Sequence, residues 1–186
     1  MLWRKMRTSI AMVFAFAFFS TSAGCQKRTL TTYEFGVLVR EHGCESAEQI
    51  AMRQPDPDLY IGIMYDLGLC RKQDDAQAIS HYLQSARRGN DEAMYSVFLQ
   101  IAKKGSKEGY KPGEAEQAQH WLIKAGENNN WRAAYVLALC YEKGCWDLPI
   151  DKEKSKHYKE VLEKYRPNPS LNKDDQQQAS PPLDAR

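Results

Sequence analysis

The sequence has little that marks the commonest functional classes. Its 26 Lys and Arg residues are nearly balanced by 24 Asp and Glu residues, and this balance argues against a nucleic-acid-binding protein, whose domain is typically strongly basic. It contains no HExxH motif, no nucleophile elbow and no CxxC spacing, so it offers neither a recognisable catalytic centre nor a zinc site. We therefore predict a protein that is not an enzyme and that carries no metal or cofactor.

Long apolar runs are also scarce. Residues 10–19 are ten consecutive apolar residues, whereas a membrane-spanning helix needs roughly twenty. Three basic side chains precede this run, and the small residues at 20–24 follow it. The arrangement predicts a secretory signal peptide over residues 1–24. Without that segment the chain carries 23 basic and 24 acidic residues, so its net charge becomes −1 instead of +2.

The residues at the end of the signal peptide resemble the lipobox of bacterial lipoproteins. Residues 22–25 read Ser-Ala-Gly-Cys, with Ser22 where that motif usually has Leu. The resemblance implies that Cys25 is acylated and anchors the chain, with residues 25–30 as a lipidated linker, because each buried CH₂ contributes about 0.8 kcal/mol. Gln26 after the Cys implies the outer membrane of a Gram-negative cell. The alternative is ordinary cleavage beside Cys25, which leaves a free thiol.

A motif with a small residue, a Tyr and a Gly at fixed spacing recurs along the chain. Residues 61–68 (IGIMYDLG) are repeated as residues 137–144 (LALCYEKG), and a weaker copy lies at 93–105. In the weaker copy Phe98 replaces the small residue and Ile101 replaces the Tyr. Each copy is followed by apolar residues at i, i+3, i+4 and i+7, which is typical of one helical face. These residues are Ile79, Tyr82, Leu83 and Ala86, then Ala118, Trp121, Leu122 and Ala125, then Tyr158, Val161, Leu162 and Tyr165.

The chain therefore reads as helix–turn–helix three times over, and its residues resemble Sel-one-like repeats, relatives of the tetratricopeptide repeat. The second half of the repeat is matched best at residues 74–90, by Asp74-x-x-Gln77-Ala78, His81-Tyr82 and Ser85-Ala86-x-x-Gly89-Asn90. The resemblance implies an all-α fold, a short α-solenoid (a right-handed superhelix) of about three repeats over residues 57–166.

The segments on either side of the repeats differ from them. Residues 31–56 are expected to form a capping pair of helices, because two capping-box spacings each precede apolar residues. These are Thr31-x-x-Glu34 and Ser46-x-x-Gln49, and Asp56 before Pro57 is a further helix start. Residues 167–186 are rich in Pro, Gln, Asp and Asn, and we expect a disordered tail because they cannot bury enough apolar surface.

Four cysteines remain if Cys25 is acylated, and four cysteines allow three pairings. In the repeat register Cys140 and Cys145 lie at the end of a first helix and in the turn after it. Cys70 occupies nearly the same turn of the first repeat, and Cys44 lies between the capping helices. We predict the pairs Cys44–Cys70 and Cys140–Cys145, which join neighbouring parts of the stack. Metal binding by the four is the alternative.

The resemblance also implies a binding surface on the first helices, which line the concave side of such arrays. On the tetratricopeptide pattern Leu59, Tyr95 and Tyr135 would line it. Charged residues would lie further along it, namely Asp66, Lys103, Glu142 and Lys143. The alternative is that Tyr95 and Tyr135 only fill space between repeats.

A lysine-rich segment follows in the second repeat, with Lys103, Lys104, Lys107 and Lys111 among glycines and a proline. We interpret it as a long turn, which in repeat proteins often belongs to the binding face. A solvated flexible loop and contact with anionic lipid headgroups are the alternatives.

Together these patterns predict a lipid-anchored envelope protein that acts as a protein–protein interaction scaffold. It would be held in the outer membrane through Cys25 and face the periplasm, with the cell surface as the other option. Proteins that it resembles include periplasmic immunity proteins and envelope adaptors, and either role suits a small scaffold with one protein partner. The alternative is an enzyme or small-ligand binder acting on cell-wall material, which a pocket bringing His81 or His120 against carboxylates would favour.

Overall fold

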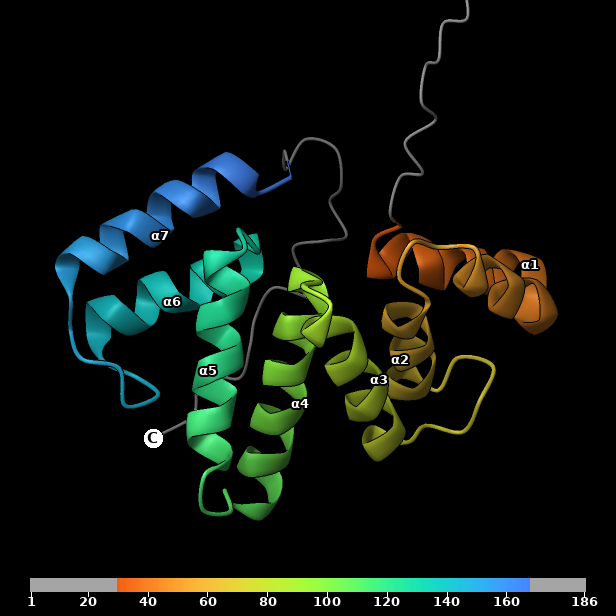
Figure 1. Ribbon diagram of the computed structural model, residues 1–186, viewed down its shortest axis with the longest axis horizontal. Coiled ribbons are helices and arrows are strands. Elements are labelled where there is room, and N and C mark those ends of the chain that lie inside the picture. The colour runs from red at the N-terminus through yellow and green to blue at the C-terminus, as the bar shows by residue number, and fades with distance from the viewer. Residues whose placement is uncertain (1–29, 168–186) are drawn as a thin grey trace, which may run out of the picture.

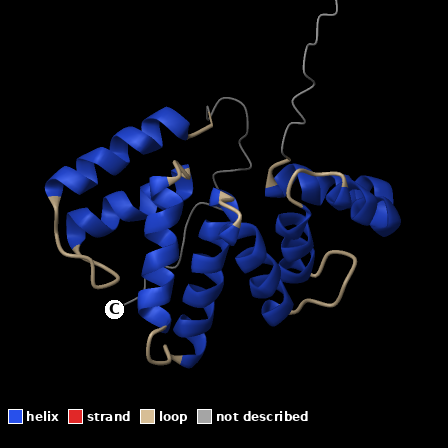
Figure 2. Cartoon of the chain, viewed as in Figure 1, coloured by secondary structure: helices blue, strands red, loops and turns tan. Residues whose placement is uncertain are grey.

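The computed structural model describes residues 30–167, so the predicted signal peptide, Cys25 and residues 168–186 of the predicted tail lie outside it. The described chain is all-α, as predicted (Figures 1 and 2). No helix of this part is long and apolar enough to cross a membrane. Its helices are α1 (Thr32–Met52), α2 (Pro57–Leu67), α3 (Asp75–Arg87), α4 (Asp91–Glu108), α5 (Glu114–Glu127), α6 (Trp131–Lys143) and α7 (Lys152–Tyr165).

The predicted capping helices are two segments of α1 that meet at a kink. Gly43 has a φ of 77° and a ψ of 175°, which no helical residue adopts. The capping box at the start of α1 is confirmed, because the Thr31 side chain accepts from the Glu34 backbone N–H and the Glu34 side chain accepts from the Thr31 N–H. Tyr60 of α2 then donates a hydrogen bond of 2.8 Å to the carbonyl of Leu30, which ties the start of this cap to the first repeat.

The other six helices form three consecutive pairs, α2 with α3, α4 with α5 and α6 with α7, and each pair packs on the next (Figure 1). The small residue of the repeat motif allows the close approach within the first pair. A Cβ atom added at Gly62 would lie 2.6 Å from ring atoms of Tyr82 on α3. Such a distance is far below an ordinary carbon–carbon contact. The glycine of the repeat motif is therefore needed for the contact between α2 and α3.

A second recurring contact joins the two helices of a pair through aromatic rings. Tyr65 of α2 stacks on His81 of α3 with ring centroids 5.7 Å apart and planes at 11°. Tyr141 of α6 stacks on Tyr158 of α7 in the same way, at 5.9 Å and 2°. The two pairs occupy matching positions of the first and third repeats. In the second repeat Ile101 takes the place of the Tyr, and it is buried.

Asparagines join each repeat to the one before it. Asn90 caps the start of α4 and donates its side-chain amide to Asp56 at 3.0 Å, at the start of α2. Asn130 caps the start of α6 and donates to Asp91 at 3.0 Å, at the start of α4. Asp56 does not cap its own helix with its side chain. Its carboxylate accepts instead from Arg88 and Asn90, which follow α3. The predicted helix start is therefore present, but the Asp56 carboxylate joins the first repeat to the second.

The lysine-rich segment is not a long turn, and that prediction was wrong. Helix α4 continues to Glu108, so Lys103, Lys104 and Lys107 are helical and only the residues from Gly109 onward form the connection. Tyr110 folds back against the C-terminal part of α4, where its hydroxyl lies 3.5 Å from the carbonyl of Ala102. The packing of Tyr110 therefore stabilises the C-terminal part of α4, although the glycines of this segment favour a turn.

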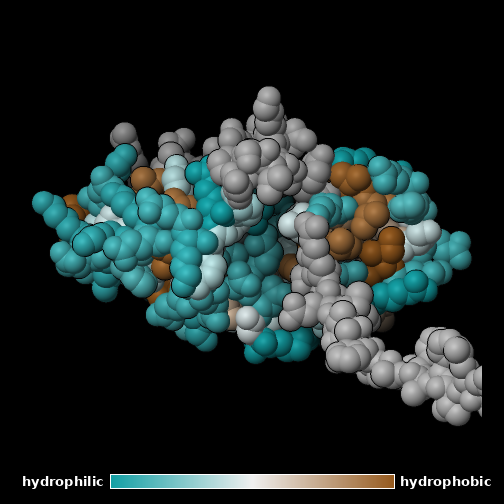
Figure 3. Space-filling model, turned by 90° about the horizontal axis from the view of Figure 1, so that it is seen from above, coloured by the Kyte–Doolittle hydropathy of each residue, from teal (hydrophilic) through white to brown (hydrophobic). Residues whose placement is uncertain are grey.

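Most of the surface seen from above is hydrophilic, and apolar side chains gather over the α1 end (Figure 3). Met52, at the C-terminal end of α1, is 64% exposed. The buried core instead runs as one cluster through all the helices.

Candidate functional site

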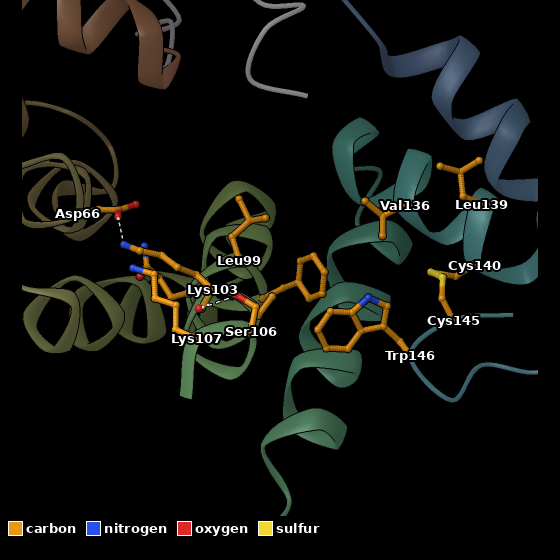
Figure 4. Close-up of a pocket in the computed structure, with 13 residues that line it drawn as sticks. Asp66, Leu99, Lys103, Ser106, Lys107, Val136, Leu139, Cys140, Cys145 and Trp146 are labelled. Atoms are coloured by element: carbon orange, nitrogen blue, oxygen red, sulfur yellow. Dashed lines mark hydrogen bonds and ion pairs between the residues drawn. A yellow bond between two sulfur atoms is a disulfide. The ribbon is translucent and has the colours of Figure 1, made fainter. Parts of the chain in front are cut away.

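A cavity of about 480 Å³ lies across the first helices of the three pairs (Figure 4). We call it the first-helix groove. It is lined by Asp66 of α2, by α4 from Phe98 to Lys107, by α6 from Val136 to Cys140, and by Cys145 and Trp146 of the turn after α6. All three repeats therefore contribute to one hollow, whose size falls in the range of ligand pockets in proteins.

The α6 side of the groove is apolar and aromatic. Val136 and Leu139 belong to α6, and Trp146 lies near Val136 on the following turn (Figure 4). The Trp146 ring packs edge-on against Phe98, with centroids 5.2 Å apart, and against Tyr110 at 5.6 Å. Edge-to-face pairs of this kind stabilise beyond their buried area, so the indole is held in place from two directions.

A disulfide fixes the turn that carries Trp146. Cys140 at the end of α6 and Cys145 are bonded, with Cα atoms 4.8 Å apart. Trp146 and Asp147 both have left-handed backbone conformations, with φ of 54° and 53°. The Gln119 side chain of α5 donates to the Trp146 carbonyl at 3.1 Å, which holds the turn from a third helix.

The structure places the other two cysteines as a bonded pair as well. Cys44 of α1 and Cys70, in the turn after α2, have Cα atoms 5.2 Å apart. The observed pairs are thus the two that the repeat register predicts, one joining the cap to the first repeat and one inside the third.

The α2 side of the groove is charged. Lys103 lies 2.9 Å from Asp75. It also lies 3.7 Å from Asp66, and Figure 4 draws this contact. Lys107, one turn further along α4, has no ion-pair partner among residues 30–167, and it also lines an adjoining hollow of about 270 Å³ with Gln73. The groove therefore joins an apolar wall at one end to a lysine at the other.

Comparison with known proteins places this architecture. No protein-family model and no curated protein matches the sequence. A solved Sel1 repeat protein from Oxalobacter formigenes superposes with a TM-score of 0.58 and 22% identity, over 72% of this chain and 56% of that one. A protective antigen present in uropathogenic Escherichia coli strains, displaying an SLR fold, superposes with a TM-score of 0.55 and 21% identity, over 74% and 31%. The chain has the Sel1-repeat fold.

The resemblance found in the sequence is therefore confirmed at the level of the fold. This chain spans about half the length of the first neighbour and less than a third of the second. The Sel1-repeat fold stacks helix pairs into an array.

Five of the seven predicted surface residues of this Sel1-repeat fold are at least partly exposed, and they fall into three groups. Asp66 and Lys103 line the groove. Tyr135 is 39% exposed on α6, beside the groove-lining Val136. Glu142 and Lys143 are exposed near the end of α6, where Glu142 forms an ion pair of 2.7 Å with Lys159 of α7.

Two of the predicted surface residues are in fact buried, and the prediction for them was wrong. Leu59 is 3% exposed and Tyr95 is 4% exposed. Burial raises the pKa of Tyr95 to about 12, and its ring lies 5.8 Å from that of Phe98. The first turns of α2 and α4 face the core of the stack, so these side chains fill space between repeats, which is the alternative for Tyr95.

The sequence contained signals for two groove residues that the prediction missed. Phe98 stands where the first and third repeats have a small residue, and in the Sel1-repeat fold its large ring supports Trp146. Trp146 directly follows a cysteine of the third repeat. A departure from the repeat motif in one copy and a tryptophan in a disulfide-closed turn both mark this site.

The histidines do not gather into a catalytic or metal site. His81 Nδ1 lies 2.9 Å from Asp58, which also pairs with Arg88 at 2.6 Å. Burial raises the pKa of Asp58, but the hydrogen bonds from His81 and Arg88 together lower it below its usual 3.8. The pair links α2 to α3 and lines neither hollow described above. Residues 30–167 contain no cluster of acidic, histidine or cysteine side chains that could hold a metal ion.

Proposed function

We propose that this protein is a scaffold for protein–protein recognition in the bacterial cell envelope. The observation that carries the proposal is the first-helix groove, in which an aromatic wall fixed by a disulfide faces lysines across three repeats. Buried aromatic anchors of this kind dominate the energetics of many protein interfaces.

The proposed location follows from the sequence before the described residues. Cys25 is acylated, holds the chain in the outer membrane and leaves the repeats facing the periplasm. Support comes from the two cystines, because disulfides persist in oxidising compartments such as the periplasm. In this setting a small scaffold with one groove acts as an immunity protein or as an adaptor.

Site-specific photocrosslinking in living cells tests the scaffold role. A photoreactive phenylalanine analogue is placed at Leu139, in the groove, and at Lys156, an exposed position on α7, in the full chain. We expect a discrete covalent product with one protein from Leu139 and none from Lys156. Equal products from both positions, or none from Leu139, would contradict recognition through the groove.

The alternative role in processing or binding cell-wall material has less support. It predicts a pocket that brings His81 or His120 against carboxylates. His81 does meet Asp58, but that pair is engaged by Arg88 outside both hollows. His120 is exposed and contacts the ring of Trp121.

A further inference from the structure

The first-helix groove contains a side-chain amide that the protein leaves without a hydrogen bond. Gln100 lines the groove and is 7% exposed, and its side chain has no hydrogen-bond partner among residues 30–167. The matching positions of the other repeats hold Met64 and Cys140, and both side chains are buried in the apolar core. Solvent reaches its amide atoms through the groove, so a partner from outside the chain can hydrogen-bond them.

Two further polar groups in the groove lack partners within the described residues. The indole N–H of the half-buried Trp146 donates no hydrogen bond there. Lys107 has no carboxylate within ion-pair distance, whereas Lys103 is engaged by Asp75 and Lys104 by Glu114. An apolar wall, an amide and an ammonium group thus lie in one hollow, each available to a ligand.

We propose that the groove binds an extended segment of a partner protein in which a large apolar side chain lies close to an acidic residue. The apolar side chain packs against Phe98 and Trp146. Gln100 hydrogen-bonds a backbone amide group of the segment, and Lys107 pairs with the carboxylate. This inference rests on the scaffold role proposed above and specifies the chemistry of its partner.

The amide decides for a peptide over a lipid chain. A Gln side chain presents one acceptor and two donors, which match the C=O and N–H of a peptide group. An acyl chain or an apolar small molecule would cover Gln100 and leave it without a partner, which costs free energy. Charge decides for an acidic segment, because the cation without a protein partner at the groove is Lys107.

Selection from a random heptapeptide display library tests the proposal. The full chain is purified from membranes in detergent, together with the variants Lys107→Glu and Gln100→Met. Lys156→Glu serves as the matched control, because it makes the same charge change on α7 away from both hollows. We expect the native chain to select peptides that combine Trp, Phe or Leu with Asp or Glu.

Binding of a selected peptide is then measured by fluorescence anisotropy on each variant. We expect Lys107→Glu and Gln100→Met each to weaken binding by about tenfold or more, the effect of losing a charged or buried partner, while Lys156→Glu changes it less than about twofold, as for a distant exposed charge. Thermal melts followed by circular dichroism show that each variant is folded. The Gln100 variant carries the native residue of the first repeat, so it keeps the helix intact.

Three results would overturn the proposal. Selected peptides without acidic residues, or full affinity in Lys107→Glu, would contradict the acidic partner. A protein crosslinked at Leu139 would then still support the scaffold role. Binding of the aromatic anion anilinonaphthalene sulfonate with no peptide selected would show a pocket for small amphiphiles. No selected peptide together with no crosslink from Leu139 would remove the scaffold role as well.

Discussion

At the scale of single residues, the fold depends on side chains that are small where two helices meet. Gly62 is the clearest case, because ring atoms of Tyr82 occupy the space that a Cβ atom would need. Gly36 on α1 is a useful contrast, since nothing lies within 4 Å of the corresponding Cβ position. Both glycines are helical, so they differ in packing and share their backbone conformation.

We expect Gly62→Ala to lower the free energy of unfolding by about 1–3 kcal/mol, the usual effect of overpacking a core. Gly36→Ala should leave it unchanged or raise it by up to about 1 kcal/mol, because Ala is the better helix former. Urea unfolding followed by the helical circular dichroism signal measures both. Equal effects of the two substitutions would mean that the contact between Gly62 and Tyr82 does not constrain the pair.

At the scale of helices and turns, the sequence predicted the elements that depend on short-range apolar spacing. Apolar spacing predicted α3, α5 and α7, because the buried face of a second helix is continuous. Apolar spacing did not predict where α4 ends. Gly105 lowers helix propensity, but Tyr110 packs against it and the helix continues to Glu108. The tetratricopeptide pattern placed Tyr95 on the surface, whereas the side of a first helix that is covered depends on the neighbouring repeat.

The two disulfides give a prediction at this scale. On the chain-entropy model, a bridge stabilises more when it closes a longer loop. The double variant Cys44→Ser with Cys70→Ser opens a separation of 26 residues and should cost about 3–4 kcal/mol of unfolding free energy. Cys140→Ser with Cys145→Ser opens a separation of 5 residues and should cost about 2 kcal/mol, with a larger change in tryptophan fluorescence because Trp146 is released.

Denaturant titration of both double variants measures the two costs. Intact-mass analysis of protein taken from the outer-membrane fraction, after blocking of free thiols, checks the premise. Four blocked cysteines among those of the described chain would show that neither bridge forms in the cell, and the predicted order of stabilities would then have no basis.

At the scale of the whole molecule, the groove is distributed over repeats that differ in sequence. The first repeat supplies Asp66, the second supplies Gln100 and the lysines, and the third supplies the disulfide-held Trp146. Repeat patterning predicted the stack and placed Asp66 and Lys103 on its binding surface, but it did not predict Phe98 or Trp146, because Phe98 departs from the repeat motif and Trp146 lies in the turn after it.

The anchor is also a property of the whole chain. We expect metabolic labelling with an alkyne analogue of palmitate to mark the native protein in the outer-membrane fraction. Cys25→Ser should abolish the label and release the protein, since the acyl chains provide the membrane affinity. Cys70→Ser, which also removes one thiol, should keep the label. Labelled Cys25→Ser protein would contradict lipidation at this residue.

The asparagine junctions give the array a direction. Asn90 at the start of α4 relies on an acidic residue at the start of α2, and Asn130 at the start of α6 relies on one at the start of α4. Each helix start is therefore completed by a residue that lies earlier in the chain. A polypeptide is made from its N-terminus, and an exported chain that folds in the same order finds every acceptor already in position. The repeats can then assemble one after another, without waiting for the C-terminal helix.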